Sequence, residues 1–147
     1  PSRKMQRSQT GVLLLEALIA ILIFSLGILG SIGLQAASIK QATAAEDRAK
    51  AAALANDLIG RMWSSDHDAL ATNFGTSGTG FTSWMSTVTA SQLPGITSTA
   101  NKPTISFSSG PSSIAGVKPG TRAEIVIKWQ AHNESAPHQY TAIAVIK

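Results

Sequence analysis

Several things are scarce in this chain of 147 residues. It has no cysteine, which excludes disulfide scaffolds, thiolate metal sites and cysteine nucleophiles. Only 14% of the residues are charged and 5% are aromatic, against about 25% charged residues in an ordinary soluble domain. No proline occurs between Pro1 and Pro94. The length suits one domain, and the low charge indicates that apolar residues are concentrated in one part of the chain.

The net charge of +4 comes from the first residues of the chain. Arg3, Lys4 and Arg7 precede Gly11, and the rest of the chain holds 12 − 3 = 9 basic residues against 8 acidic ones. A nearly neutral body excludes the broad basic surface that nucleic-acid binding requires, so we expect no nucleic-acid partner. The basic residues predict instead that this end of the chain lies in the cytoplasm, because positive charges stay on the inner side of a membrane.

The apolar residues are concentrated between residues 12 and 34. Positions 17–39 carry no charge, and Glu16 is the only charged residue between Arg7 and Lys40. About 20 apolar residues suffice for a helix to cross the hydrocarbon layer, so 12–34 is predicted to span a membrane. Three interpretations are open: a removable secretory signal, an ordinary anchor, or a specialised cleaved leader. The run is long for a secretory signal, and an ordinary anchor gives no reason for an acid at Glu16.

The order of these features resembles the amino terminus of type IV pilins. Basic residues, then Gly11, then Val12-Leu13-Leu14-Leu15-Glu16 and an unbroken apolar helix match the class III signal of that family. The resemblance implies a leader at 1–11 that a prepilin peptidase removes after Gly11, and methylation of the new terminus at Val12 by the same enzyme. The family usually has Phe where this chain has Val12. The resemblance also implies a role for Glu16, whose carboxylate would pair with the free amine of a neighbouring subunit and set the axial register.

Residues 35–63 predict an amphipathic helix that continues from the membrane segment into a head. Ten alanines lie between Ala36 and Ala55, and alanine is the best helix former. Leu54, Leu58 and Met62 form an apolar ridge, with Ala55, Ile59 and Trp63 beside it. The charged residues from Lys40 to Lys50 are grouped toward one side of this helix, and Asp57 and Arg61 are expected to form an exposed helix pair.

Three segments of the predicted helix resemble the PilV family of minor pilins more specifically than the pilin superfamily as a whole. The segments that carry it are Ile23 to Gly30, Gly33 to Ala37 and Leu54 to Trp63. Gly27, Gly30 and Gly33 lie in the second half of the apolar run, where they either let helices pack closely or soften the helix.

Residues 64–147 are predicted to form a periplasmic head. Between Thr72 and Ser113, 19 of 42 residues are Ser or Thr, so 64–103 is expected to contain loops and short strands. The apolar residues spaced through it are expected to hold it to a core: Phe74, Phe81, Trp84, Val88, Leu93 and Ile96. Period-two patterns at 104–108, 122–130 and 140–147 predict an antiparallel sheet over 104–147. The predicted fold is therefore α+β, a long helix packed by its second half on a small sheet, as in the pilin roll.

The sequence has no catalytic motif, so we expect neither enzyme activity nor a cofactor. Asp66-His67-Asp68 has metal-binding residue types, but adjacent side chains point in different directions, so no metal site is expected.

The resemblance implies an inner-membrane protein with a cytoplasmic amino end that later enters the pilus on the cell surface. Its implied partners are the prepilin peptidase and methyltransferase, other minor pilins, the major pilin, the pilus assembly platform and the membrane. As a minor pilin near the tip it would prime pilus assembly and support twitching motility and adhesion. Three alternatives are a minor pseudopilin of a type II secretion system, an uncleaved anchored binding domain, and a major pilin, which usually has a disulfide.

Overall fold

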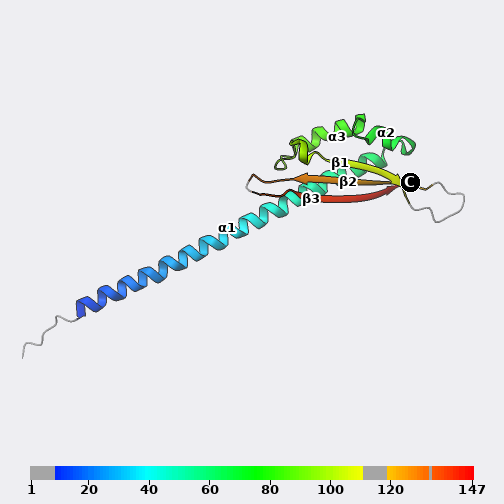
Figure 1. Cartoon of the computed structure of the whole chain (residues 1–147). Coiled ribbons are helices and arrows are strands. Elements are labelled where there is room, and N and C mark those ends of the chain that lie inside the picture. Colours follow the sequence, from blue (N-terminus) through cyan, green and yellow to red (C-terminus); the bar gives the residue numbers. More distant parts are fainter. Residues whose placement is uncertain (1–8, 111–118, 133) are drawn as a thin grey trace, which may run out of the picture. The chain divides into compact units, whose positions relative to one another are not determined.

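The computed structural model describes residues 9–110, 119–132 and 134–147 (Figure 1). The expected leader therefore lies largely outside the described residues, as do Arg3, Lys4 and Arg7. The chain divides into two compact units, Pro1–Ala44 and Ala45–Lys147. The elements in order are α1 (Gln9–Trp63), η1 (His67–Ala69), α2 (Leu70–Phe74), α3 (Thr79–Ala90), η2 (Thr99–Asn101), β1 (Thr104–Ser109), β2 (Thr121–Trp129) and β3 (His138–Ile146).

Helix α1 confirms the predicted continuous helix and its end at Trp63. No glycine or proline interrupts residues 34–59, which explains why the helix continues beyond the apolar run. Within that run, the Ser25 hydroxyl donates to the Ile21 carbonyl at 2.7 Å and the Ser31 hydroxyl to the Gly27 carbonyl at 3.1 Å. The two hydroxyls are thus bonded within the helix itself and add no unsatisfied donor to its apolar surface.

The sheet of the second unit has the strand order β1-β2-β3, with both pairs antiparallel. The predicted strands differ from β1, β2 and β3 by one or two residues at their ends, and the predicted hairpin between the last two strands is confirmed. The pairing of β2 with β3 runs without a break from Thr121 opposite Ile146 to Trp129 opposite His138. The alternation predicted for β2 is also confirmed, since Ala123, Ile125, Ile127 and Trp129 are all buried.

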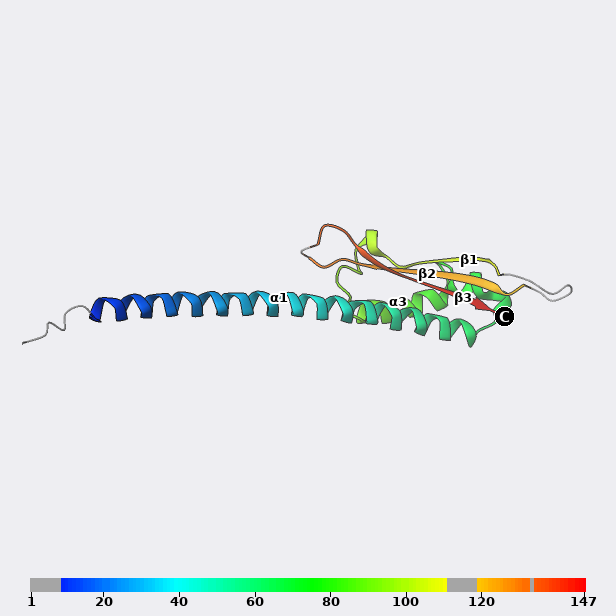
Figure 2. The same ribbon diagram turned by 90° about the horizontal axis from the view of Figure 1, so that it is seen from below.

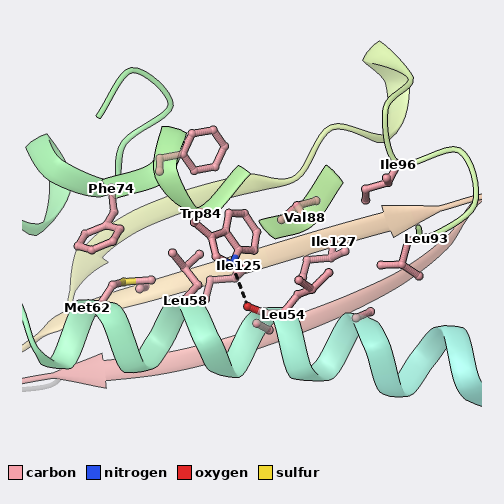
Figure 3. Close-up of a cluster of buried hydrophobic side chains, with 14 of the residues drawn as sticks. Leu54, Leu58, Met62, Phe74, Trp84, Val88, Leu93, Ile96, Ile125 and Ile127 are labelled. Atoms are coloured by element: carbon pink, nitrogen blue, oxygen red, sulfur yellow. Dashed lines mark hydrogen bonds between the residues drawn. The ribbon is translucent and has the colours of Figure 1, made fainter. Parts of the chain in front are cut away.

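The core of this unit lies between the sheet and the helices on one of its faces (Figure 2). The last part of α1 contributes the buried residues Ala51, Leu54, Ala55, Leu58 and Met62. Figure 3 shows Trp84 of α3 among Leu54, Leu58 and Ile125, with its indole Nε1 donating to the Leu54 carbonyl at 3.0 Å. The predicted packing of the second half of the helix on a sheet is therefore confirmed, and α3 packs on the same face of the sheet as α1 (Figure 2).

The segment 64–103 differs from its prediction, because it is largely helical. Helix α3 runs through twelve residues in which Phe81, Trp84 and Val88 are buried. These positions share one helical face, and that apolar face against the core outweighs the weak helix propensity of Ser and Thr. The six apolar residues expected to hold this segment to the core are indeed all buried: Phe74, Phe81, Trp84, Val88, Leu93 and Ile96.

A second correction concerns Trp63, which was predicted to continue the apolar stripe of α1. Its side chain is 49% exposed, and its ring meets the His67 ring edge-on at a centroid distance of 5.9 Å. The buried stripe follows positions 51, 54, 55, 58 and 62, which share one side of a helix with 3.6 residues per turn. Trp63 lies about 100° around the helix from Met62 and so leaves the core.

Candidate functional site: the exposed apolar helix and its acid

The first part of α1 presents large apolar side chains to its surroundings on every side. Their exposed fractions range from 46% for Ile28 to 76% for Leu34. The most apolar 18-residue window has a mean hydropathy of 2.8 and none of it is buried. By length and composition, this helix is therefore able to span a membrane. These large apolar residues are Val12, Leu13, Leu14, Leu15, Leu18, Ile19, Ile21, Leu22, Ile23, Phe24, Leu26, Ile28, Leu29, Ile32, Leu34 and Ile39.

Glu16 is exposed on this apolar surface, one helical turn after Val12. Val12, Leu15, Glu16 and Ile19 line the same shallow groove along the helix. Gly11 and Val12 both lie inside α1, and Gly11 has open space around its Cα hydrogen. The helix thus places Val12, the predicted new amino-terminal residue, and Glu16 on one side, and the other residues that line this groove are apolar.

Within the described part of the chain, a side chain at Gly27, Gly30 or Gly33 would clash with nothing. A Cβ built at any of the three meets no atom within 4 Å. Three glycines still weaken a helix by roughly 1 kcal/mol each relative to alanine. The predicted close packing would therefore involve other helices, whereas the predicted softening acts on this helix alone.

Arg61 does more than the exposed helix pair predicted from the sequence. Its Nε lies 3.0 Å from Asp57 Oδ2, as expected for residues four apart. Its Nη2 also donates to Thr87 Oγ1 at 3.1 Å and its Nη1 to Ser83 Oγ at 3.5 Å. Because Ser83 and Thr87 are on α3, Arg61 joins α1 to α3. The sequence does not predict this link, because the hydroxyls that Arg61 contacts are more than twenty residues away in the chain.

We expect Arg61→Met to destabilise the head by about 1 kcal/mol, because the link to α3 and a half-exposed ion pair are lost while the apolar stem is kept. Denaturant unfolding of the full chain, followed by fluorescence, measures this free energy. Lys50→Met is the matched control, because Lys50 is similarly exposed and its ion pair at 2.8 Å is with Glu46, on its own helix. An equal effect of the two substitutions would show that the α3 hydroxyls contribute nothing.

The Asp66-His67-Asp68 segment forms local structure at the end of α1. Asp66 Oδ1 accepts a hydrogen bond from the Asp68 amide at 3.0 Å, which caps η1. His67 Nε2 lies 3.3 Å from the Trp63 carbonyl. Across residues 9–110, 119–132 and 134–147, no cluster of three His, Asp or Glu side chains is placed to hold a metal ion.

Asp47 departs from the charged side of the helix with which the sequence groups it. It is buried, with 7% exposed, whereas Glu46 and Arg48 beside it are exposed. Position 47 precedes Ala51 by one turn and so begins the buried stripe of α1. The apolar ridge in the sequence begins at Leu54, so a charged residue two turns earlier gives no sign that it belongs to the same buried stripe.

The apolar part of α1 is thus exposed along its length and carries one acid, Glu16. The unit Ala45–Lys147 has its own hydrophobic core. Comparisons with protein-family models, with curated proteins and with solved structures find no match to this chain.

Proposed function

We propose that the chain is a PilV-like minor pilin, a subunit that enters the type IV pilus with other minor pilins and primes its assembly. The observation that carries this proposal is the exposed apolar surface of α1, which holds a single acid, Glu16. A soluble domain does not leave so many large apolar side chains uncovered, so lipid and then other helices are their natural partners.

The proposed mechanism is structural and has two stages. In the membrane, residues 12–34 span the bilayer and the head lies on the periplasmic side. In the filament, apolar helices replace lipid around α1. Removal of the leader after Gly11 creates an amine at Val12, and the Glu16 carboxylate of a neighbouring subunit pairs with it. Opposite charges attract strongly where water is excluded, so a single pairing is enough to select one axial offset.

Loss of the leader also removes the charge excess that marks the amino end as cytoplasmic. The residues from Val12 onward carry 9 basic and 8 acidic groups, and 9 − 8 = +1. The subunit that leaves the membrane is then almost neutral. Its helix can therefore pack beside those of other subunits without the electrostatic repulsion that uncleaved basic leaders would cause.

The decisive experiment is the intact mass of the membrane-extracted protein in cells with and without prepilin peptidase. With the peptidase, the expected chain begins at Val12 and carries one added methyl group. Without it, everything before Val12 is kept. A chain that keeps those residues when the peptidase is present would exclude the pilin role and favour an ordinary anchored domain.

Complementation of deletion strains then distinguishes a minor pilin from a pseudopilin of a type II secretion system. Restored piliation in a strain that lacks its own subunit supports the minor pilin, whereas restored export of secreted proteins alone supports a type II pseudopilin.

A further inference from the structure

The peptide bond that the proposed function requires to be cut lies inside a helix. Helix α1 already includes Gln9, so the bond between Gly11 and Val12 belongs to a helical turn. In an α-helix each carbonyl accepts a hydrogen bond from the amide four residues further on, which pairs the Gly11 carbonyl with the Leu15 amide. The carbonyl that a peptidase has to attack is thus engaged in the backbone hydrogen bonding of α1.

A carbonyl held in this way is poorly placed for hydrolysis. In that reaction the hydroxyl of a water molecule adds to the Gly11 carbonyl carbon and the carbon–nitrogen bond breaks. The Val12 nitrogen takes up the remaining proton and leaves as an amine. The carbonyl oxygen gains negative charge on the way and needs hydrogen-bond donors from the enzyme beside it. The helix has to release that oxygen first, and cleavage within folded segments proceeds through such opened forms.

The residues around the bond are weak helix formers. Thr10 and Val12 are β-branched, and Gly11 is less suited to a helix than any residue except proline. No acid lies between Gln9 and Leu15, where a negative charge would stabilise the start of a helix. The three leucines that end this stretch are strong helix formers. The weakest part of the sequence here therefore coincides with the predicted cleavage site.

Packing within the described part of the chain does not explain why residue 11 is a glycine. A Cβ built at Gly11 meets no atom within 4 Å. Alanine would therefore fit at this position and would strengthen the helix. The effect of the glycine is to make this turn easier to open, because glycine has more conformational freedom to lose when it becomes helical.

We propose that the peptidase cuts the chain only after the turn from Gln9 to Val12 has unwound, and that Thr10 and Gly11 set the population of this unwound form. The inference depends on the proposed function and specifies how its cleavage site is regulated. Helix ends open and close within about a microsecond, so the cleavage rate follows the population of the opened form. A substitution that changes helix propensity in this turn then changes the rate by the same factor as that population.

Two substitutions at Thr10 test the proposal without changing either residue of the bond. Thr10→Ala and Thr10→Gly both remove the hydroxyl and leave a small residue, but alanine favours the helix and glycine opposes it. The assay uses purified peptidase and the full chain in the same micelles, at substrate concentrations below KM. We expect Thr10→Gly to be cut about four- to fivefold faster than Thr10→Ala, with the wild type between them. Equal rates, or faster cleavage of Thr10→Ala, would overturn the proposal.

A compensated variant separates unwinding from recognition of the glycine itself. Gly11→Ala should lower kcat/KM about four- to fivefold. Adding Gln9→Gly and Thr10→Gly to it brings the summed helix propensity of the turn back to near its original value. The triple variant should therefore return to within about twofold of the wild type. If it stays as slow as Gly11→Ala, the peptidase recognises the missing side chain directly and the proposal is wrong.

Gly27→Ala is the matched control for Gly11→Ala. A Cβ at Gly27 also meets no atom within 4 Å, and this position lies roughly four helical turns beyond the cleavage site. The same exchange there should leave the cleavage rate unchanged. Equal slowing by both substitutions would mean that the rate follows the whole helix rather than the turn around the bond, which contradicts the proposal.

Amide hydrogen exchange provides a readout that needs no enzyme. In the uncleaved chain in micelles without peptidase, NMR should show the Leu15 amide exchanging about four- to fivefold faster in Thr10→Gly than in Thr10→Ala. Cleavage rates that differ between the two variants while this exchange does not would overturn the link to unwinding.

The wild-type chain in the same cleavage assay separates this proposal from the proposed function. A wild type that is cut after Gly11, with rates indifferent to the residue at position 10, overturns only the unwinding step. A wild type that the peptidase leaves uncut overturns the pilin role.

Discussion

Trp84→Ala should destabilise the head by about 3–5 kcal/mol, the usual cost of removing a buried aromatic side chain. Trp84 is fully buried, and its indole joins α3 to the Leu54 carbonyl of α1 at 3.0 Å. The substitution therefore leaves a large cavity where α1, α3 and the sheet meet (Figure 3). For a unit of this size, each kcal/mol lowers the melting temperature by roughly 4–8 °C. Thermal unfolding of the full chain in detergent, followed by circular dichroism, measures the shift.

Trp63→Ala is the matched control for this result. The same side chain is removed, but Trp63 is 49% exposed and contacts His67 rather than the core. Its expected cost is about 1 kcal/mol or less. Equal losses from the two substitutions would contradict the assignment of Trp84 to the core. Trp84→Phe should fall between them, because most of the ring is kept and the hydrogen bond is lost.

Glu16→Ala should leave processing after Gly11 largely intact but lower incorporation into pili at least tenfold. The reason is that the proposed pair between the Glu16 carboxylate and a neighbour's Val12 amine exists only in the assembled bundle. In low-dielectric surroundings the unpaired amine would then be an uncompensated buried charge, which typically costs 3–5 kcal/mol. Immunoblots of membranes and of sheared pili measure the two quantities in the same cells.

Two further variants separate charge from shape at this position. Glu16→Gln keeps the size of the side chain and removes only its charge, so it should match Glu16→Ala. Glu16→Asp keeps the charge and should retain part of the incorporation. Normal incorporation of Glu16→Gln would show that the carboxylate does not set the register.

Trp84 and Glu16 differ in how far the sequence alone could assign them. Glu16 is conspicuous because it interrupts an apolar run, and the cost of an acid in hydrocarbon is local to that residue. Trp84 lies in a Ser/Thr-rich segment, where the composition favours loops. Its helical environment depends on Phe81 and Val88 finding the core together, and that core is built by residues distant in the chain.

The sequence by itself determined the long helix, its apolar first part, the end at Trp63 and the alternation of the three strands. These depend on periodicity and propensity between residues a few positions apart, which a linear pattern records. Only the tertiary structure decided that α3 is a helix, that Arg61 reaches α3, that Asp47 is buried and that Trp63 is not. Each of those depends on which distant surface covers the residue. The spacing of Phe81, Trp84 and Val88 fits one face of a helix, but packing of that face against the core is what outweighs the weak helix propensity of the surrounding Ser and Thr.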